Sequence, residues 1–141
     1  MALLRDFTTE LYGSFPNLRR GNHTLKSPFD PNYNCIAFAL GLPTWRNPEP
    51  GDYRTTVRWI RRQFGYKRVN DARYEKGYEK LAIYADAQDQ FMHVAKQEGT
   101  KWISKLGDFH DLVHGDLHLL RLPYGNVVAF LRRKRKKARK P

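Results

Sequence analysis

A single cysteine and one histidine are the residues of this chain that could carry out nucleophilic chemistry. Cys35 is the only cysteine among 141 residues, and it follows a turn rich in Pro, Asp and Asn. The apolar segment that begins there and the glycine at position 41 predict a short helix over residues 33–41. Cys35 would lie in or near its first turn. Backbone N–H groups without partners and the helix dipole stabilise a thiolate there, which makes the thiol a better nucleophile.

A thiol nucleophile needs a neighbouring imidazole to take its proton. Of the five histidines, His93 alone falls on a clearly predicted strand. A two-residue turn at Glu98-Gly99 would place His93 directly opposite Ser104 on the returning strand. Ser104 could then orient the imidazole as the third member of a triad, and Asp108 and His114 are the other candidates for that role. The alternative is that His93 is an ordinary hydrogen-bonded residue of the sheet.

The chemistry that these residues would support is acyl transfer through a thioester. Cys35 would attack an amide or ester carbonyl, and His93 would pass the thiol proton to the leaving group. The backbone N–H of Cys35 and a donor from Asn34 or Tyr33 would hold the oxyanion, although both residues also suit a helix cap or a turn. Trp102, expected opposite Ala95, would line the cleft or pack in the sheet.

The pattern of the whole chain predicts an α+β fold, with N-terminal helices packed on an antiparallel sheet. Asp52 is a suitable cap for an amphipathic helix that Gly65 would end. We expect an irregular lead-in before the cysteine helix and an ambiguous, weakly helical segment late in the chain. The expected elements are helices at 1–13, 33–41 and 53–64, strands at 66–69, 80–85, 90–97, 100–105 and 126–132, a lead-in at 14–32 and the ambiguous segment at 109–120.

The order of these motifs resembles the papain-like cysteine hydrolases. The string Asn34-Cys35-Ile36-Ala37-Phe38 is similar to the start of the cysteine helix in amidases and endopeptidases of the NlpC and CHAP type. His93-Val94-Ala95 with Gly99 and Trp102 is similar to a transglutaminase-like hairpin, although no Asp lies near Trp102. The stretch Trp102-Ile103-Ser104-Lys105-Leu106-Gly107 also resembles a family of small uncharacterised bacterial proteins. This resemblance implies a papain-like fold with Cys35 as nucleophile and His93 as base.

Positive charge is concentrated at the C-terminus. The formal net charge is +12, and residues 132–140 read RRKRKKARK. We expect residues 1–131 to form one domain and residues 132–141 to be a disordered basic tail, because a run of like charges repels itself and buries no apolar surface. The tail could bind nucleic acid or an anionic membrane. A second basic cluster, at residues 58–68, is expected to be the solvated face of a helix.

Other classes of site have weaker signals. His110, His114 and His118 recur every four residues, but Gly115 interrupts the segment and no further ligand completes a zinc site, so we expect no metal and no cofactor. The chain contains no apolar run of bilayer length and no evident signal peptide. A lone cysteine fits a reducing compartment, so a cytoplasmic location is expected.

Two functional hypotheses follow from the sequence. The first is a thiol hydrolase, a peptidase or amidase with Cys35, His93 and Ser104 as its catalytic residues and a peptide or amide-containing substrate. The second is a non-enzymatic nucleic-acid-binding or interaction module whose affinity comes from the basic tail.

Overall fold

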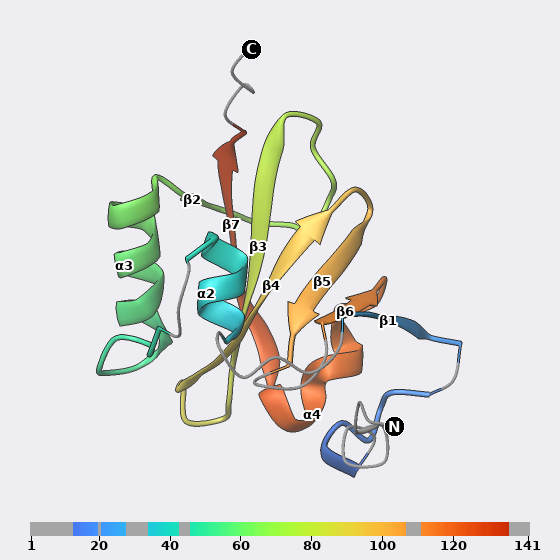
Figure 1. Cartoon of the computed structure of the whole chain (residues 1–141). Coiled ribbons are helices and arrows are strands. Elements are labelled where there is room, and N and C mark those ends of the chain that lie inside the picture. Colours follow the sequence, from blue (N-terminus) through green and yellow to red (C-terminus); the bar gives the residue numbers. More distant parts are fainter. Residues whose placement is uncertain (1–12, 20, 28–33, 43–45, 107–110, 136–141) are drawn as a thin grey trace, which may run out of the picture.

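The computed structural model describes residues 13–19, 21–27, 34–42, 46–106 and 111–135. One antiparallel sheet of seven strands, in the order β1-β6-β5-β4-β3-β7-β2, forms the centre of the molecule (Figure 1). The strands are β1 (His23–Ser27), β2 (Lys67–Val69), β3 (Tyr78–Ala85), β4 (Phe91–Glu98), β5 (Lys101–Lys105), β6 (Asp111–His114) and β7 (Asn126–Lys134). The helices are α2 (Cys35–Leu40), α3 (Tyr53–Phe64), the short 3-10 helix η1 (Leu117–Leu120) and α4 (Arg121–Tyr124).

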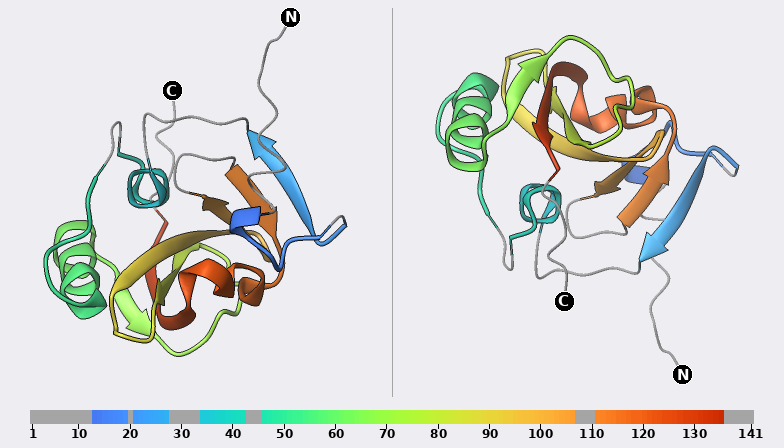
Figure 2. Two further views of the ribbon diagram at one scale, coloured as in Figure 1. Left: turned by 90° about the horizontal axis from the view of Figure 1, so that it is seen from below. Right: turned by 90° about the horizontal axis from the view of Figure 1, so that it is seen from above.

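Helices cover both faces of this sheet. Helix α2 lies on one side of β4 and β5, and η1 and α4 lie on the other (Figure 2). The side chains divide in the same way, because successive residues of a strand point to opposite faces. On β3, Leu81, Ile83 and Ala85 pack with α2 and α3, whereas Ala82 and Tyr84 pack on the face of η1. We call these the α2 face and the η1 face.

The helices predicted at residues 33–41 and 53–64 are present as α2 and α3, and their caps explain their ends. In α2, the Asn34 side chain accepts a hydrogen bond from the amide of Ala37 at 3.1 Å, and Gly41 follows the last turn with a left-handed φ of 69°. In α3, Asp52 accepts from the amide of Arg54 at 2.8 Å, and Gly65 ends the helix. Side-chain acceptors at the first turn and a left-handed residue after the last are the interactions that these residue types provide.

The α+β class is confirmed, but the start of the chain was predicted wrongly. Residues 23–27, expected in an irregular lead-in, form the edge strand β1, which pairs with β6. The helices α2 and α3 therefore follow a strand rather than precede the whole sheet. The helix expected over residues 1–13 lies almost entirely outside the described residues. None of the described helices is long and apolar enough to cross a lipid bilayer.

The second half of the chain resolves one ambiguous segment and contradicts one prediction. The segment 109–120, ambiguous in sequence with a weak helical pattern, contains the strand β6 followed by the 3-10 helix η1. The basic run does not begin outside the domain, because Arg132, Arg133 and Lys134 belong to β7. Arg132 pairs with residues of both β2 and β3, and Arg133 pairs with a residue of β3. Residues 136–141 lie outside the described part.

The turn between β4 and β5 also differs from its prediction. Glu98 pairs with Lys101 and Gln97 with Trp102, so the two turn residues are Gly99 and Thr100. Gly99 has a φ of 59°, which a glycine adopts without strain. The turn predicted at Glu98-Gly99 would have paired Gln97 with Thr100, and the actual register is displaced from it by two residues.

Gly125 joins α4 to β7 at a point where only glycine fits. A Cβ built at this position would lie 2.1 Å from the carbonyl oxygen of Ala85, and the residue has a φ of +87°. The backbone at the end of β3 and the backbone before β7 therefore approach each other too closely for any side chain at position 125.

We expect Gly125→Ala to destabilise the protein far more than Gly77→Ala. Gly77 has a similar φ of +85°, but a Cβ at this position would meet only open space, so Gly77→Ala reports the backbone cost alone. That cost is about 1–2 kcal/mol, and forced overpacking at Gly125 adds about 1–3 kcal/mol. Urea unfolding of both variants measures the difference, and equal losses of stability would contradict the proposed contact.

Candidate functional site

The predicted nucleophile, Cys35, is the first residue of α2 and is buried on the α2 face. Its side chain packs in one apolar cluster with residues such as Val94 of β4 and Ala129 of β7. Burial raises the pKa of the Cys35 thiol to about 11, although backbone hydrogen bonds at Val94, Ile36 and Cys35 itself act in the opposite direction. The position at a helix start therefore does not activate this thiol, because the loss of water around it has the larger effect.

The predicted base, His93, lies on the opposite face of the sheet. Its ring stacks on Tyr124 with 4.3 Å between centroids and 4° between planes, and it lies 5.4 Å from the ring of Tyr84. The side chain of the next residue, Val94, is the one that points toward Cys35. The predicted contact between Cys35 and His93 is therefore wrong, because the alternation of β4 places the imidazole under η1 and α4.

His93 is an unusual buried residue. It is fully buried, and neither ring nitrogen has a hydrogen-bond partner in the described structure. Burial lowers the pKa of His93 well below its ordinary value, and the neighbouring His114 lowers it further. The ring is therefore neutral at physiological pH and acts as an aromatic packing element.

Ser104 meets a histidine, but it is His114 rather than His93. The Ser104 Oγ and the His114 Nε2 are 2.8 Å apart, and the His114 Nδ1 lies 3.2 Å from the carbonyl oxygen of Asp116. Since a carbonyl only accepts, Nδ1 carries the proton and Nε2 accepts from the serine hydroxyl. This order matches a nucleophile and its base, but Ser104 is fully buried and His114 is 1% exposed. A substrate carbonyl cannot reach the hydroxyl, so the pair stabilises the sheet.

The remaining predicted site residues have structural roles or fall outside the described residues. Asn34 caps α2 and donates to the carbonyl oxygen of Arg46 at 2.7 Å, so its amide is already used. Trp102 is buried opposite Gln97 and His114, not opposite Ala95. Tyr33, Asp108 and His110 lie outside the described residues. No group of three metal-ligating side chains occurs in the described ranges.

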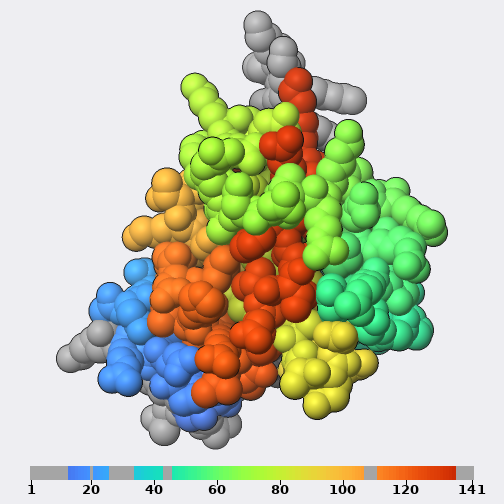
Figure 3. All heavy atoms as spheres, turned by 180° about the vertical axis from the view of Figure 1, so that it is seen from behind, coloured from blue at the N-terminus to red at the C-terminus, as the bar shows by residue number. Residues whose placement is uncertain are grey.

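The structure assembles a surface that the sequence showed only in parts. Helix α3 contains no acidic residue, and it leads after two residues into the edge strand β2, which pairs with β7. The basic helix, the basic edge strand and the end of β7 are therefore neighbours (Figure 3). We call this surface the basic face, and its exposed residues are Arg58, Arg61, Arg62, Lys67, Arg68, Lys134 and Arg135.

A buried lysine fixes the loop beside this surface. Lys80 is 1% exposed, and its ammonium group lies 3.2 Å from a carboxylate oxygen of Glu75 and 3.4 Å from one of Asp71. The hydrogen bond from Lys80 is the main reason that the pKa of Glu75 is lowered. The loop between β2 and β3 is thereby held against the sheet, and it presents Tyr74 with 45% of its surface exposed.

One family model matches this chain, over residues 24–132, and its description is "Domain of unknown function (DUF7689)". The chain belongs to this family. The match runs from β1 into β7, so it includes residues of all seven strands. No curated protein and no solved structure matches the chain.

We expect Cys35 to be unreactive in the folded protein. With a thiol pKa of about 11, alkylation by iodoacetamide at pH 8 should be about tenfold or more slower than in the urea-unfolded chain, since the thiolate is the reactive form. His93→Ala should leave the pH profile of the reaction unchanged. A midpoint near or below the free-thiol value that moves in His93→Ala would contradict the separation of the two residues.

Stability should fall as the pH falls below the ordinary histidine pKa. The folded-state pKa of His93 is lowered, so below about pH 6.5 the unfolded chain binds a proton that the folded chain does not. The expected slope is about 1.4 kcal/mol per pH unit for each such histidine, and His114 contributes in the same direction.

His93→Phe is the matched variant for this measurement, because it keeps a ring against Tyr124 and cannot titrate. Urea unfolding at several values between pH 7.5 and pH 5 should give a shallower pH dependence for the variant than for the wild type. Parallel curves would show that His93 is already protonated or accessible in the folded state.

Proposed function

We propose that this protein binds nucleic acid through the basic face. The observation that carries the proposal is that three basic segments, α3, β2 and the end of β7, lie next to one another at one edge of the sheet. Residues 54–79 and 132–135 contain twelve lysines and arginines against three carboxylates. Such a surface attracts phosphates and releases counterions when it binds them.

The carboxylates of this region are already engaged with other basic groups. Glu75 pairs with Lys80 and Arg132, and Glu79 pairs with Arg133 and Arg135. Arg58, Arg61 and Arg62 on α3 form no ion pair within the described structure. Their guanidinium groups are available to a ligand, and the planar fork of arginine matches a phosphate.

The aromatic content of this region favours nucleic acid over a lipid surface. Tyr74 is exposed between Arg73 and Lys76, in the position of a side chain on which a base can stack. Leu122 is the other large hydrophobic residue with high exposure among the described residues, and it lies on α4, away from the basic face. The described basic face thus offers no aliphatic wedge for insertion into a membrane.

A thiol hydrolase of papain-like fold stays a prediction and is the second candidate. It is favoured by the packing of α2 against β4 and β5, with Cys35 in the first turn. The mechanism needs a base, and His93 and His114 both lie on the η1 face. A thiol hydrolase would need an imidazole to reach Cys35 on the α2 face, whereas binding at the basic face needs no change in the structure. Nucleic-acid binding is therefore the function that the geometry supports better.

The test is binding of fluorescent single-stranded and duplex oligonucleotides over a range of salt concentrations. Log affinity should fall linearly with log salt, and the variant Arg58→Gln/Arg61→Gln/Arg62→Gln should bind more weakly. Its slope on duplex DNA should be smaller by about 0.9 for each phosphate contact that is lost. A chain ending at Arg135 measures the share contributed by residues 136–141, and Tyr74→Ala should weaken single-strand binding selectively.

The control variant is Arg19→Gln/Lys96→Gln/Lys101→Gln, which removes the same charge from exposed or partly exposed positions outside the basic face. It should retain the wild-type slope and most of the affinity. An equal loss of oligonucleotide affinity in both triple variants would show that only net charge matters, and it would contradict binding at a defined face. Binding to phosphatidylserine vesicles without binding to oligonucleotides at the same salt concentration would show that the ligand of the basic face is a membrane and not nucleic acid.

A further inference from the structure

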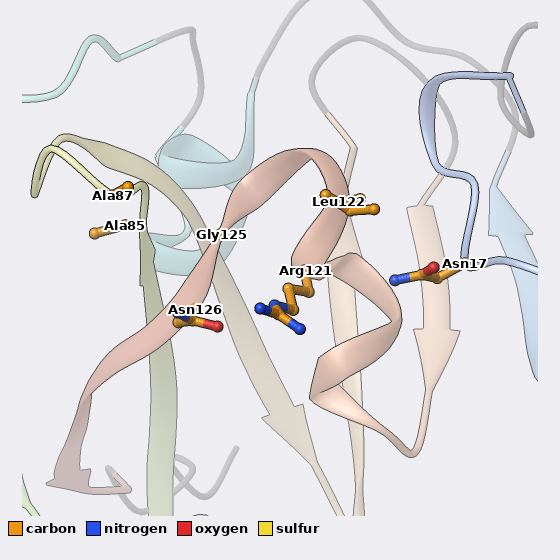
Figure 4. Close-up of a pocket in the computed structure, with 7 residues that line it drawn as sticks. All are labelled: Asn17, Ala85, Ala87, Arg121, Leu122, Gly125 and Asn126. Carbon is orange, nitrogen blue, oxygen red and sulfur yellow. The ribbon is translucent and has the colours of Figure 1, made fainter.

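A second candidate binding site lies at the opposite end of β7, where α4 joins the sheet. It is a surface pocket of about 500 Å³, and Figure 4 shows its lining. This volume is within the range of about 300–1,000 Å³ that small-molecule sites occupy. The walls come from the segment before β1, the end of β3 with the turn after it, and the stretch from α4 to the start of β7, so three parts of the chain far apart in sequence meet there.

Three polar side chains line this pocket. Figure 4 shows the Arg121 side chain pointing toward Asn126, while Asn17 lies on the other side of the ribbon of η1 and α4. No hydrogen bond or ion pair joins the Arg121 guanidinium or either amide group to another described side chain. One cation and two amides that form no hydrogen bond or ion pair with another described side chain therefore line the same pocket.

Small residues line part of the pocket. They include Ala85 and Gly125, whose backbones make the close approach that excludes a Cβ at position 125. Ala87 lies in a turn where the carboxylate of Asp86 accepts from the amides of Gln88 and Gln90, both at 2.9 Å. Leu122, 52% exposed, gives the rim an apolar element.

We propose that this pocket binds an α-carboxylate joined to an amide, as in an N-acyl amino acid or the last residue of a peptide. The single guanidinium matches a singly charged carboxylate through two parallel hydrogen bonds. Asn17 and Asn126 each supply a donor and an acceptor, which complement the carbonyl and N–H of the adjoining amide. Ala85, Ala87 and Leu122 leave room for a small apolar side chain.

The test uses N-acetylalanine as the probe, with binding followed by amide chemical shifts of the full-length protein. The shifts should be centred on Arg121, Gly125 and Asn126. Arg121→Gln should weaken binding about tenfold or more, as expected when a charge-assisted hydrogen bond is lost. Arg121→Lys should recover only part of it, because an ammonium group cannot make the paired contact.

Arg62→Gln is the matched control, since it removes the same charge from the basic face and should leave N-acetylalanine binding unchanged. N-acetylalanine methylamide, which lacks the carboxylate, should not bind. Two further probes are a pentapeptide ending in alanine and the same peptide with an amidated C-terminus. Binding of the acid form alone would show that the pocket accepts the C-terminal carboxylate of a peptide as well as that of a free acyl amino acid. Equal binding of acid and amide forms, or no effect of Arg121→Gln, would overturn the proposal.

Discussion

The strict alternation of side chains along β3 and β4 is the constraint on which the rest of the structure depends. Five consecutive residues of β3, from Leu81 to Ala85, are at most 2% exposed, so this strand is buried on both faces. Two residues that are adjacent in such a strand therefore pack in different cores, one on each face of the sheet. Val94 belongs to the core under α2, and His93 belongs to the core under η1. A thiol and an imidazole can each be well placed on its own face and still be separated by the sheet.

Much of the fold follows from local chemistry that the sequence displays. The bounds of α3 could be predicted because Asp52 and Gly65 supply both caps, and the last strand was visible in its apolar run. The edge strand β1 could not, since it is short and its pairing partner β6 is non-local. Apolar and polar residues do not alternate clearly in β1, so the turn signal of the Gly and Asn that precede it dominated the prediction.

The candidate site was harder to predict because three facts had to be known together. The residue types of Cys35, His93 and Ser104 are suitable, but the face on which α2 packs, the register of β4 with β5 and the burial of each group decide whether they meet. A turn one residue later, at Gly99-Thr100, displaces the pairing by two residues. The basic face could not be predicted for a related reason. We expected Arg132 to lie in a tail outside the domain, whereas it belongs to β7 and pairs with Lys67 of β2.

β7 connects the two surfaces that we propose as anion-binding sites. Asn126 begins the strand at the pocket and Lys134 ends it at the basic face, a separation of about 27 Å at the usual rise of a β-strand. This exceeds the screening length of roughly 8 Å at physiological salt, so charges at the two ends act independently through solvent.

The position of β2 at the edge of the sheet has a consequence for how copies of this protein behave toward one another. An edge strand exposes unpaired backbone groups, onto which a strand of another molecule can add. β2 is only three residues long, and two of them are the exposed Lys67 and Arg68. A second copy that approached in register would bring like charges together. The same cations that we propose to bind a polyanion therefore oppose the addition of a second copy to the sheet, and protein that has lost them should be prone to self-association.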